Sequence, residues 1–138
     1  MNALKISESA SLGFHAMYYL SENPKGHESG PSIAKSLGVS SAHLAKVLMR
    51  LVHGGLLKPV RGAKGGYQLA KAPDRINLQE VYEAIEGRLI LCDCLLGRAR
   101  CPRKQCLLGG LLKNVNHEVR DYLSQTTLAD LVRENREK

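Results

Sequence analysis

The segment from residue 31 to residue 69 constrains the fold more than any other part of the chain. In its middle, four apolar residues recur at the spacing i, i+3, i+4, i+7: Leu44, Val47, Leu48 and Leu51. This spacing predicts a helix with one buried face. A shorter helix is predicted from Pro31, because proline is favoured in the first turn of a helix, and the turn over 38–40 separates the two. Two helices joined in this way are typical of a helix-turn-helix, whose second helix enters the major groove of DNA.

A glycine-rich and basic turn follows this pair of helices. The sequence RGAKGG, residues 61–66, lies between two short runs with apolar residues, which predicts a β-hairpin. Glycine permits a tight hairpin tip and lets the backbone approach a phosphate closely. A basic hairpin directly after a recognition helix is the wing of a winged helix. We therefore expect a mainly α fold with a small β-hairpin wing, that is, a winged helix-turn-helix.

Further helices are predicted on both sides of this unit. The first runs over about residues 9–23, and the polar segment 24–30 after it is expected to be a flexible loop. Asn77 begins another helix, since Glu80 stands three residues later, as in a capping box.

The last predicted helix begins at about residue 107 and carries an apolar stripe that needs a partner. The stripe consists of Leu108, Leu111, Leu112, Val115, Val119 and Tyr122. A second copy of the helix would cover it, and a two-fold dimer also matches palindromic DNA. The alternative is that the helix folds back on its own domain. We accordingly expect a winged helix-turn-helix DNA-binding domain over 1–90, a cysteine-rich loop over 91–106, and a long C-terminal dimerisation helix with a tail over 107–138.

The charge of the chain favours a polyanionic partner. Its 138 residues carry a formal net charge of +7, and residues 1–70 hold eight Lys and Arg against three acidic residues. Such a balance points to nucleic acid, and the absence of Trp with a single Phe argues against stacking on single-stranded bases. We expect the recognition helix and the wing to contact double-stranded DNA. The candidate residues are Ser40, Ser41, His43, Lys46, Arg50, Arg61, Lys64, Gly65, Gly66 and Tyr67.

The four cysteines of the chain are clustered, as Cys92, Cys94, Cys101 and Cys106. Thiols clustered in this way in a reducing compartment usually bind a metal or act in redox sensing, and a structural disulfide framework is disfavoured. Four thiolates suffice for one [2Fe–2S] or [4Fe–4S] cluster, and zinc accepts the same ligands. A reversible disulfide is a further alternative.

The residues over 39–87 resemble the Rrf2 family of bacterial transcription regulators. The wing RGAKGGYQLA is the most specific part of the resemblance, and the segment TLADLV over 127–132 is similar to the family's C-terminus. The resemblance implies a dimeric winged-helix repressor or activator. Many members hold an iron–sulfur cluster in the loop before the dimerisation helix and sense iron–sulfur status, nitric oxide, redox state or iron, whereas others carry no cluster.

The resemblance also implies a set of cluster ligands. Cys94, Cys101 and Cys106 match the cysteines of the cluster-binding members, and Cys92 is an extra cysteine and the first candidate for a fourth ligand. Some members recruit a residue of the first helix instead, in some cases from the partner subunit. In this chain the matching stretch offers Glu8, Ser11 and His15.

Two positions depart from the pattern of some family members. Gly109 stands where some members have a histidine ligand, so that mode of ligation is not carried over. Ala45 stands where some have a glutamate that tunes the choice of DNA, so that switch is not carried over either.

These observations together predict a cytoplasmic, homodimeric transcription regulator, a repressor, that binds a palindromic operator in double-stranded DNA. One iron–sulfur cluster per monomer is expected to control DNA binding in response to redox state, nitric oxide or iron, and zinc is the less favoured occupant. The alternative is a cluster-free or zinc-bound regulator switched by thiol–disulfide chemistry or a small ligand.

Other classes of function receive less support from the sequence. No apolar segment is long enough to span a membrane, and neither catalysis nor a small-molecule substrate is indicated. A winged helix that binds another protein is a rival hypothesis. A redox enzyme is disfavoured because the chain has no C-x-x-C motif.

Overall fold

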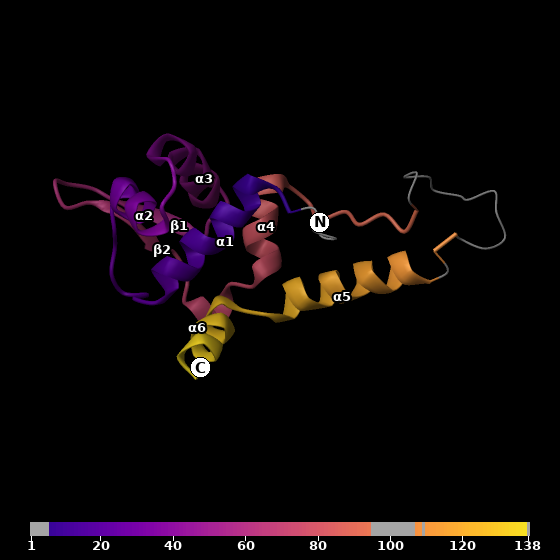
Figure 1. Ribbon diagram of the computed structural model, residues 1–138. Coiled ribbons are helices and arrows are strands. Elements are labelled where there is room, and N and C mark those ends of the chain that lie inside the picture. The colour runs from indigo at the N-terminus through magenta and orange to yellow at the C-terminus, as the bar shows by residue number, and fades with distance from the viewer. Residues whose placement is uncertain (1–5, 95–106, 109, 138) are drawn as a thin grey trace.

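The computed structural model describes residues 6–94, 107, 108 and 110–137, which form a winged-helix body from which one long helix projects (Figure 1). The elements are α1 (Glu8–Ser21), α2 (Gly30–Leu37), α3 (Ser41–His53), β1 (Leu57–Val60), β2 (Gly66–Leu69), a short 3-10 helix η1 (Pro73–Arg75), α4 (Leu78–Glu86), α5 (Leu111–Gln125) and α6 (Leu128–Arg136). Within the described residues, no helix combines the length and apolar character that a membrane span requires.

The core of the body lies around α1, which packs against α2, α3, α4 and α6. Three residues of α1, Ala10, Ala16 and Met17, are completely buried. The predicted apolar stripe of α3 is buried as well, because Leu44, Leu48 and Leu51 are all inaccessible to solvent. The opposite face of α3 is therefore directed outward, as the helix-turn-helix pattern predicts.

The helix ends follow the signals in the sequence. Ser40 caps α3, its hydroxyl accepting from the backbone N–H of His43, and Gly38 ends α2 in the left-handed conformation with φ 68°. The predicted capping box of α4 is present, because Asn77 Oδ1 accepts from Glu80 N at 2.8 Å and Glu80 Oε2 accepts from Asn77 N at 2.9 Å. Local side-chain chemistry thus sets these boundaries.

The wing is an antiparallel hairpin in which Leu57 lies opposite Leu69 and Val60 lies opposite Gly66. The segment over 24–29 lacks regular secondary structure, as expected for a loop, but Glu28 within it forms an isolated bridge with Tyr67 of β2. The segment before α2 therefore lies beside β2, while the sheet itself has two strands, β1 and β2.

The C-terminal region forms two helices, α5 and α6, where one long helix from about residue 107 and a tail are predicted. Leu78 N donates to Thr126 O and Leu128 N donates to Ile76 O, so the chain between α5 and α6 pairs with the residues before α4. Thr127 then caps α6 in a capping box with Asp130. As a result α6 packs on α1, and Leu128 is completely buried in the same core as α1 to α4.

Candidate nucleic-acid interface and cysteine segment

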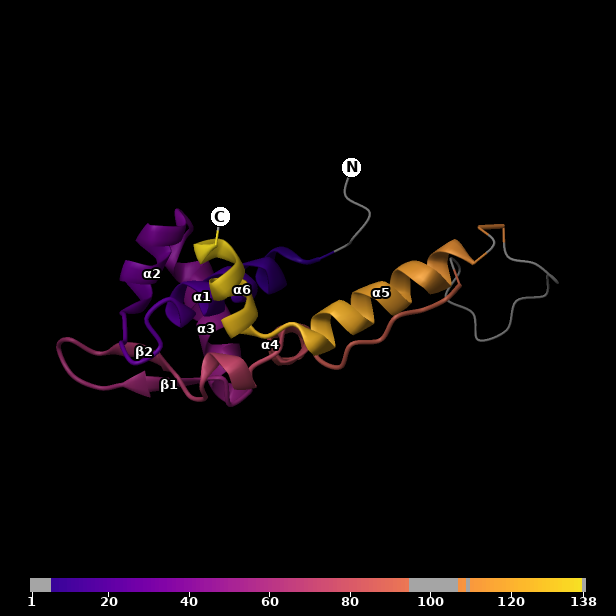
Figure 2. The ribbon, with the colours of Figure 1, turned by 90° about the horizontal axis from the view of Figure 1, so that it is seen from below.

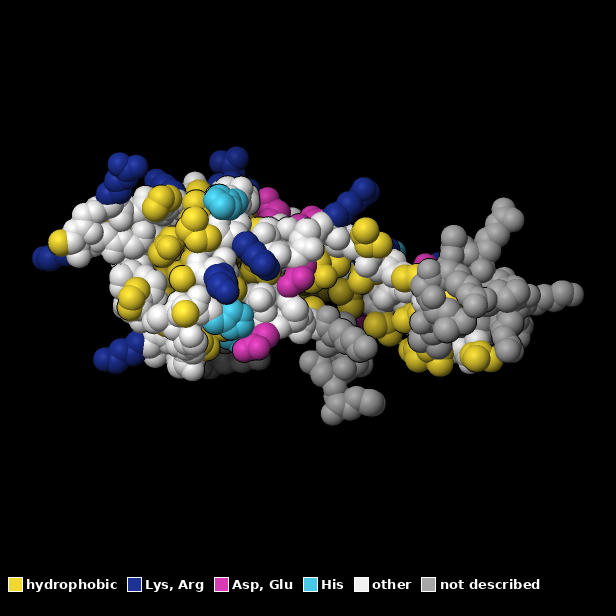
Figure 3. Space-filling view, turned by 90° about the horizontal axis from the view of Figure 1, so that it is seen from above, with side chains coloured by type: hydrophobic (Ala, Val, Ile, Leu, Met, Phe, Trp, Pro, Cys, Tyr) yellow, Lys and Arg dark blue, Asp and Glu magenta, His cyan; other side chains and the backbone are white. Residues whose placement is uncertain are grey.

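The outer face of α3 presents polar and basic side chains to solvent. Ser40, Ser41 and Lys46 are exposed on this face. In the view onto α3, Lys and Arg side chains project around the winged-helix end of the molecule, and acidic side chains are few there (Figure 3). A surface of this kind suits the phosphate backbone and base edges of a duplex.

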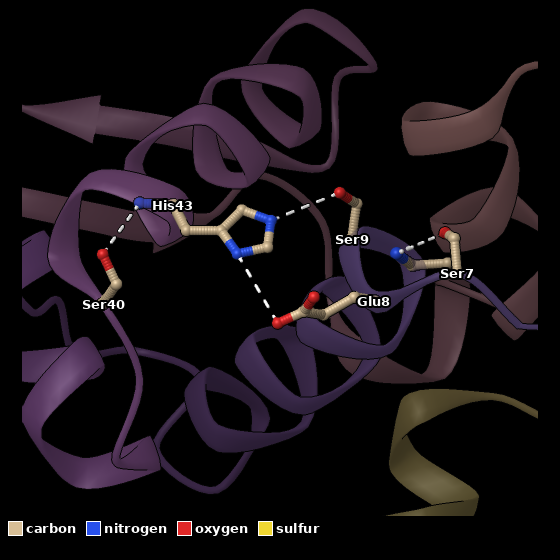
Figure 4. Close-up of polar contacts among 6 residues, drawn as sticks. Ser7, Glu8, Ser9, Ser40 and His43 are labelled. Atoms are coloured by element: carbon tan, nitrogen blue, oxygen red, sulfur yellow. Dashed lines mark hydrogen bonds and ion pairs between the residues drawn. The ribbon is translucent and has the colours of Figure 1, made fainter.

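The ring of His43 turns toward α1, although the sequence places this residue on the outer face of α3 (Figure 4). Its Nδ1 atom lies 3.8 Å from Glu8 Oε1, and its Nε2 atom lies 3.4 Å from Ser9 Oγ. The ring therefore connects the start of the recognition helix to the start of α1. Its contact with DNA stays a prediction.

The guanidinium of Arg50 is also engaged within the subunit. Its Nη1 atom donates to the backbone oxygen of Ile85 at 3.2 Å, in the last turn of α4. A cation is favoured there, because the last carbonyl groups of a helix carry partial negative charge. Arg50 thus fastens α3 to α4, a role that the sequence pattern did not indicate.

The wing carries the exposed Arg61 and Lys64 on its turn. The glycines next to them pack against backbone of the same subunit: a Cβ atom on Gly65 would lie 2.1 Å from Val60 O, and one on Gly66 would lie 2.1 Å from Glu28 O. Glycine is therefore required at position 65 by the wing itself and at position 66 by the approach of Glu28, whatever the wing contacts. Tyr67 is half-buried and packs against the core.

Two of the four cysteines lie on the segment that follows α4 and runs along α5 (Figure 2). Cys92 is exposed and Cys94 is half-buried. Asn116 of α5, 8% exposed, donates through Nδ2 to Cys92 O at 2.8 Å and to Asp93 Oδ1 at 3.0 Å. This side chain holds the start of the cysteine segment against the helix.

Of the four cysteines predicted as metal ligands, the structure describes Cys92 and Cys94, whereas Cys101 and Cys106 lie outside the described residues. Among the residues that are described, no three His, Cys, Asp or Glu side chains gather in a way that would hold a metal ion. The donor set offered by the loop consists of thiolates, the ligands that iron–sulfur clusters take.

The first-helix candidates are not brought beside Cys92 and Cys94, the two cysteines that the structure describes. Glu8, Ser11 and His15 lie on α1 in the winged-helix body, whereas the segment with Cys92 runs along α5 away from it (Figures 1 and 2). Glu8 faces His43, and His15 Nδ1 lies 2.7 Å from Ser11 O. Within the described residues, no first-helix candidate therefore shares a site with Cys92 or Cys94.

The predicted dimerisation stripe is largely open to solvent in the single chain. Leu111 is 57% exposed, Tyr122 53% and Leu108 39%, while the other members, Leu112, Val115 and Val119, are half-buried. A groove of about 470 Å³ lies beside the stripe, with apolar walls from α1, α5 and α6. An apolar surface of this extent on a basic, polar protein is typical of an interface.

Comparison with known proteins gives a consistent result. The Rrf2 family, described as an iron-dependent transcriptional regulator, matches residues 6–134. The HTH-type transcriptional regulator CymR of Bacillus subtilis (strain 168) is 31% identical over 93% of this chain and 89% of its own length. The regulator NsrR of Bacillus licheniformis is 35% identical over 72% of this chain and 71% of its own.

Solved structures show the same fold. The structure of CymR, the global cysteine regulator of B. subtilis, superposes with a TM-score of 0.79 at 28% identity and covers 95% of this chain and 98% of that one. The structure of T. potens IscR superposes with a TM-score of 0.76 at 29% identity, and the match covers 96% of this chain and 89% of that one.

Proposed function

Because the chain belongs to the Rrf2 family of transcriptional regulators, we propose that it acts in the cytoplasm as a homodimeric repressor whose binding to a palindromic operator is controlled by an iron–sulfur cluster. The observation that carries the DNA-binding part is the pairing of an outward polar face on α3 with a basic wing beside it. The recognition helix would enter the major groove, with Ser40, Ser41 and Lys46 at the DNA and the wing at the flanking backbone.

The experiment that tests DNA binding begins with selection from random duplexes by the purified chain, followed by titration of the selected duplex at several salt concentrations. We expect a sequence with two-fold symmetry to be enriched and log K to fall linearly with log salt. Selection of no sequence over a random duplex at matched salt would reject the proposal. Binding to a partner protein in place of DNA would support the rival hypothesis.

A second copy of the chain is the occupant that we propose for the apolar stripe of α5. The exposed Leu111 and Tyr122 lie on one side of this helix, while Lys113 and Arg120 are exposed elsewhere on it. Tyr122→Glu should convert a dimer into a monomer in sedimentation and weaken operator binding, because each half-site then binds alone. Lys113→Glu is the matched control and should leave the dimer intact. A wild-type chain that sediments as a monomer at micromolar concentration would contradict this assignment.

We propose the thiolates of Cys94, Cys101 and Cys106 as the ligands of the cluster, with Cys92 as the fourth and a first-helix residue (Glu8, Ser11 or His15) as the alternative. When bound, the cluster supplies a centre that reacts with oxidants and nitric oxide. Two arguments support this assignment: cysteine sulfur is the usual ligand of iron–sulfur clusters, and the chain belongs to the Rrf2 family. Anaerobic purification with iron, sulfide and zinc counts per monomer tests it, and Cys→Ser substitutions then identify the ligands.

Each outcome of this measurement has a defined meaning. Near-equal iron and sulfide supports the cluster and gives its nuclearity. About one zinc per monomer, or a protein without metal whose DNA binding responds to oxidation, supports the alternative of thiol chemistry. The name of the B. subtilis relative, global cysteine regulator, makes a small thiol the first ligand to test in that case.

A change in the cysteine segment could affect DNA binding through α5, because the segment is hydrogen-bonded to this helix. Asn116 joins Cys92 and Asp93 to α5, and α5 carries the stripe proposed for dimerisation. A change in the segment would therefore reach the helix that sets the separation of the two recognition helices. We expect holo and apo protein to bind the selected duplex with different affinity at matched salt, and equal affinities would reject this coupling.

A further inference from the structure

The segment between α1 and α2 holds the wing through its backbone and through one side chain. Glu28 N donates to Tyr67 O at 3.1 Å, and Tyr67 N donates to Glu28 O at 2.7 Å. The Nε2 atom of His27 lies 2.7 Å from the backbone oxygen of Lys64 in the wing turn. The turn that carries the wing cations is thus fastened to residues far from it in sequence.

The wing is built to receive this segment. A Cβ atom on Gly66 would lie 2.1 Å from Glu28 O, so the strand can approach Glu28 only because residue 66 is glycine. Farther along β2, Gln68 Nε2 donates to Lys25 O at 3.2 Å. The contact between the two segments therefore extends along most of β2.

The carboxylate of Glu28 ties the same residue to two helices. Its Oε2 atom accepts from Tyr19 OH of α1 at 2.7 Å and from Ser32 Oγ of α2 at 3.1 Å, and Ser36 Oγ donates to Tyr19 OH at 3.1 Å. The bond from Ser36 lowers the pKa of Tyr19, but the bond to Glu28, burial and nearby negative charge outweigh it, so this pKa is raised. Tyr19 therefore stays protonated and able to donate.

We propose that Glu28 is a positioning residue for DNA binding, whose carboxylate fixes the wing relative to the helix-turn-helix. The inference rests on the proposed function, since it assigns the wing cations to the DNA backbone. Glu28 is one of only three acidic residues among residues 1–70. Its charge alone would repel DNA, so its carboxylate acts on binding through geometry.

Three substitutions distinguish the effect of the Glu28 hydrogen bonds on DNA binding from the effect of its negative charge. Glu28→Ala removes the acceptor oxygens, Glu28→Gln removes the charge but keeps an acceptor for Tyr19 and Ser32, and Glu22→Ala removes a charge from an exposed residue at the end of α1. We expect Glu28→Ala to weaken binding to the selected duplex by about tenfold and to reduce the salt slope by roughly 0.9 for each phosphate that the wing no longer neutralises. Glu28→Gln and Glu22→Ala should bind as tightly as wild type or more tightly.

Combination with Lys64→Ala tests whether Glu28 acts through the wing. In the wild-type background, Lys64→Ala should reduce the salt slope by roughly 0.9. In the Glu28→Ala background it should change the slope little, because the wing no longer holds its cation at the phosphate. Additive effects of the two substitutions, or failure of Glu28→Gln to restore binding, would overturn the proposal.

A measurement without DNA distinguishes failure of this inference from failure of the proposed function. Hydrogen exchange at the Tyr67 amide should accelerate in Glu28→Ala and in Tyr19→Phe, which removes one hydroxyl and keeps the ring, but not in Glu22→Ala. If the wild-type chain binds no duplex, the proposed function fails and the inference fails with it. If the chain binds DNA but exchange at Tyr67 is the same in all four proteins, only the positioning role fails.

Discussion

The side-chain amide of Asn116 donates to the backbone oxygen of Cys92 at 2.8 Å, across 24 positions of the chain. Asn116 is one of two buried polar side chains among the described residues. Buried polar groups are kept when they are hydrogen-bonded, and this one directs its donors to the start of the cysteine segment. Asn116 thereby joins Cys92, a candidate cluster ligand, to the helix that carries the stripe proposed for dimerisation.

Replacement of Asn116 should free this segment. Asn116→Ala is expected to accelerate hydrogen exchange over residues 89–94 and to lower stability by about 0.5–1.5 kcal/mol, the usual net value of a hydrogen bond. Exchange is read by mass spectrometry on the apo protein. Asn114→Ala, an exposed neighbour on the same helix, is the control. Equal exchange in both variants would show that Asn116 does not hold the segment.

Lys46 should contribute to DNA affinity through a phosphate. Lys46→Ala is expected to weaken binding to specific and random duplexes alike and to reduce the salt slope by roughly 0.9, since one counterion fewer is released. Titrations at four salt concentrations give the slope. Lys113→Ala on α5, outside the proposed interface, should leave the slope unchanged, and an unchanged slope in Lys46→Ala would remove this residue from the interface.

Leu128 should be as important for stability as the residues of the winged helix proper. It is completely buried although it lies after α5, so Leu128→Ala is expected to cost about 2–5 kcal/mol. Leu107, 76% exposed, is the control, and Leu107→Ala should cost less than about 0.5 kcal/mol. Urea unfolding measures both. A small effect of Leu128→Ala would mean that α6 is not docked on the body.

The start of α4 should weaken in acid. Partial burial raises the pKa of Glu80, but hydrogen bonds from Lys71 and from the Asn77 N–H, with the charge of Lys71, outweigh it and leave this pKa below its ordinary value of 4.5. The folded state therefore binds the proton more weakly than the unfolded state, and the stabilisation present above pH 4.5 is lost as the pH falls through the lowered value. Urea midpoints should fall more steeply below this pH in the wild type than in Glu80→Gln. Glu134→Gln on α6 should follow the wild type.

The local features of the fold were predictable from the sequence. The stripe of α3, the cap at Ser40, the capping box at Asn77 and the hairpin turn over 61–65 depend on residues within a few positions of one another. The second capping box, from Thr127 to Asp130, has the same kind of signal, which predicts the start of a further helix in the segment expected to be a C-terminal tail.

The sequence by itself determined the winged helix-turn-helix, the outward face of the recognition helix and the clustering of the cysteines, because periodicity, capping and turn chemistry operate over short distances. Only the tertiary structure decided that α6 returns to α1, that His43 contacts α1 and Arg50 contacts α4, that Glu28 holds the wing and that Asn116 holds the cysteine segment. Each of these contacts joins residues 24 or more positions apart or depends on the packing of two helices. Such contacts form only when the whole core is packed, so a pattern of neighbouring residues in the sequence does not predict them.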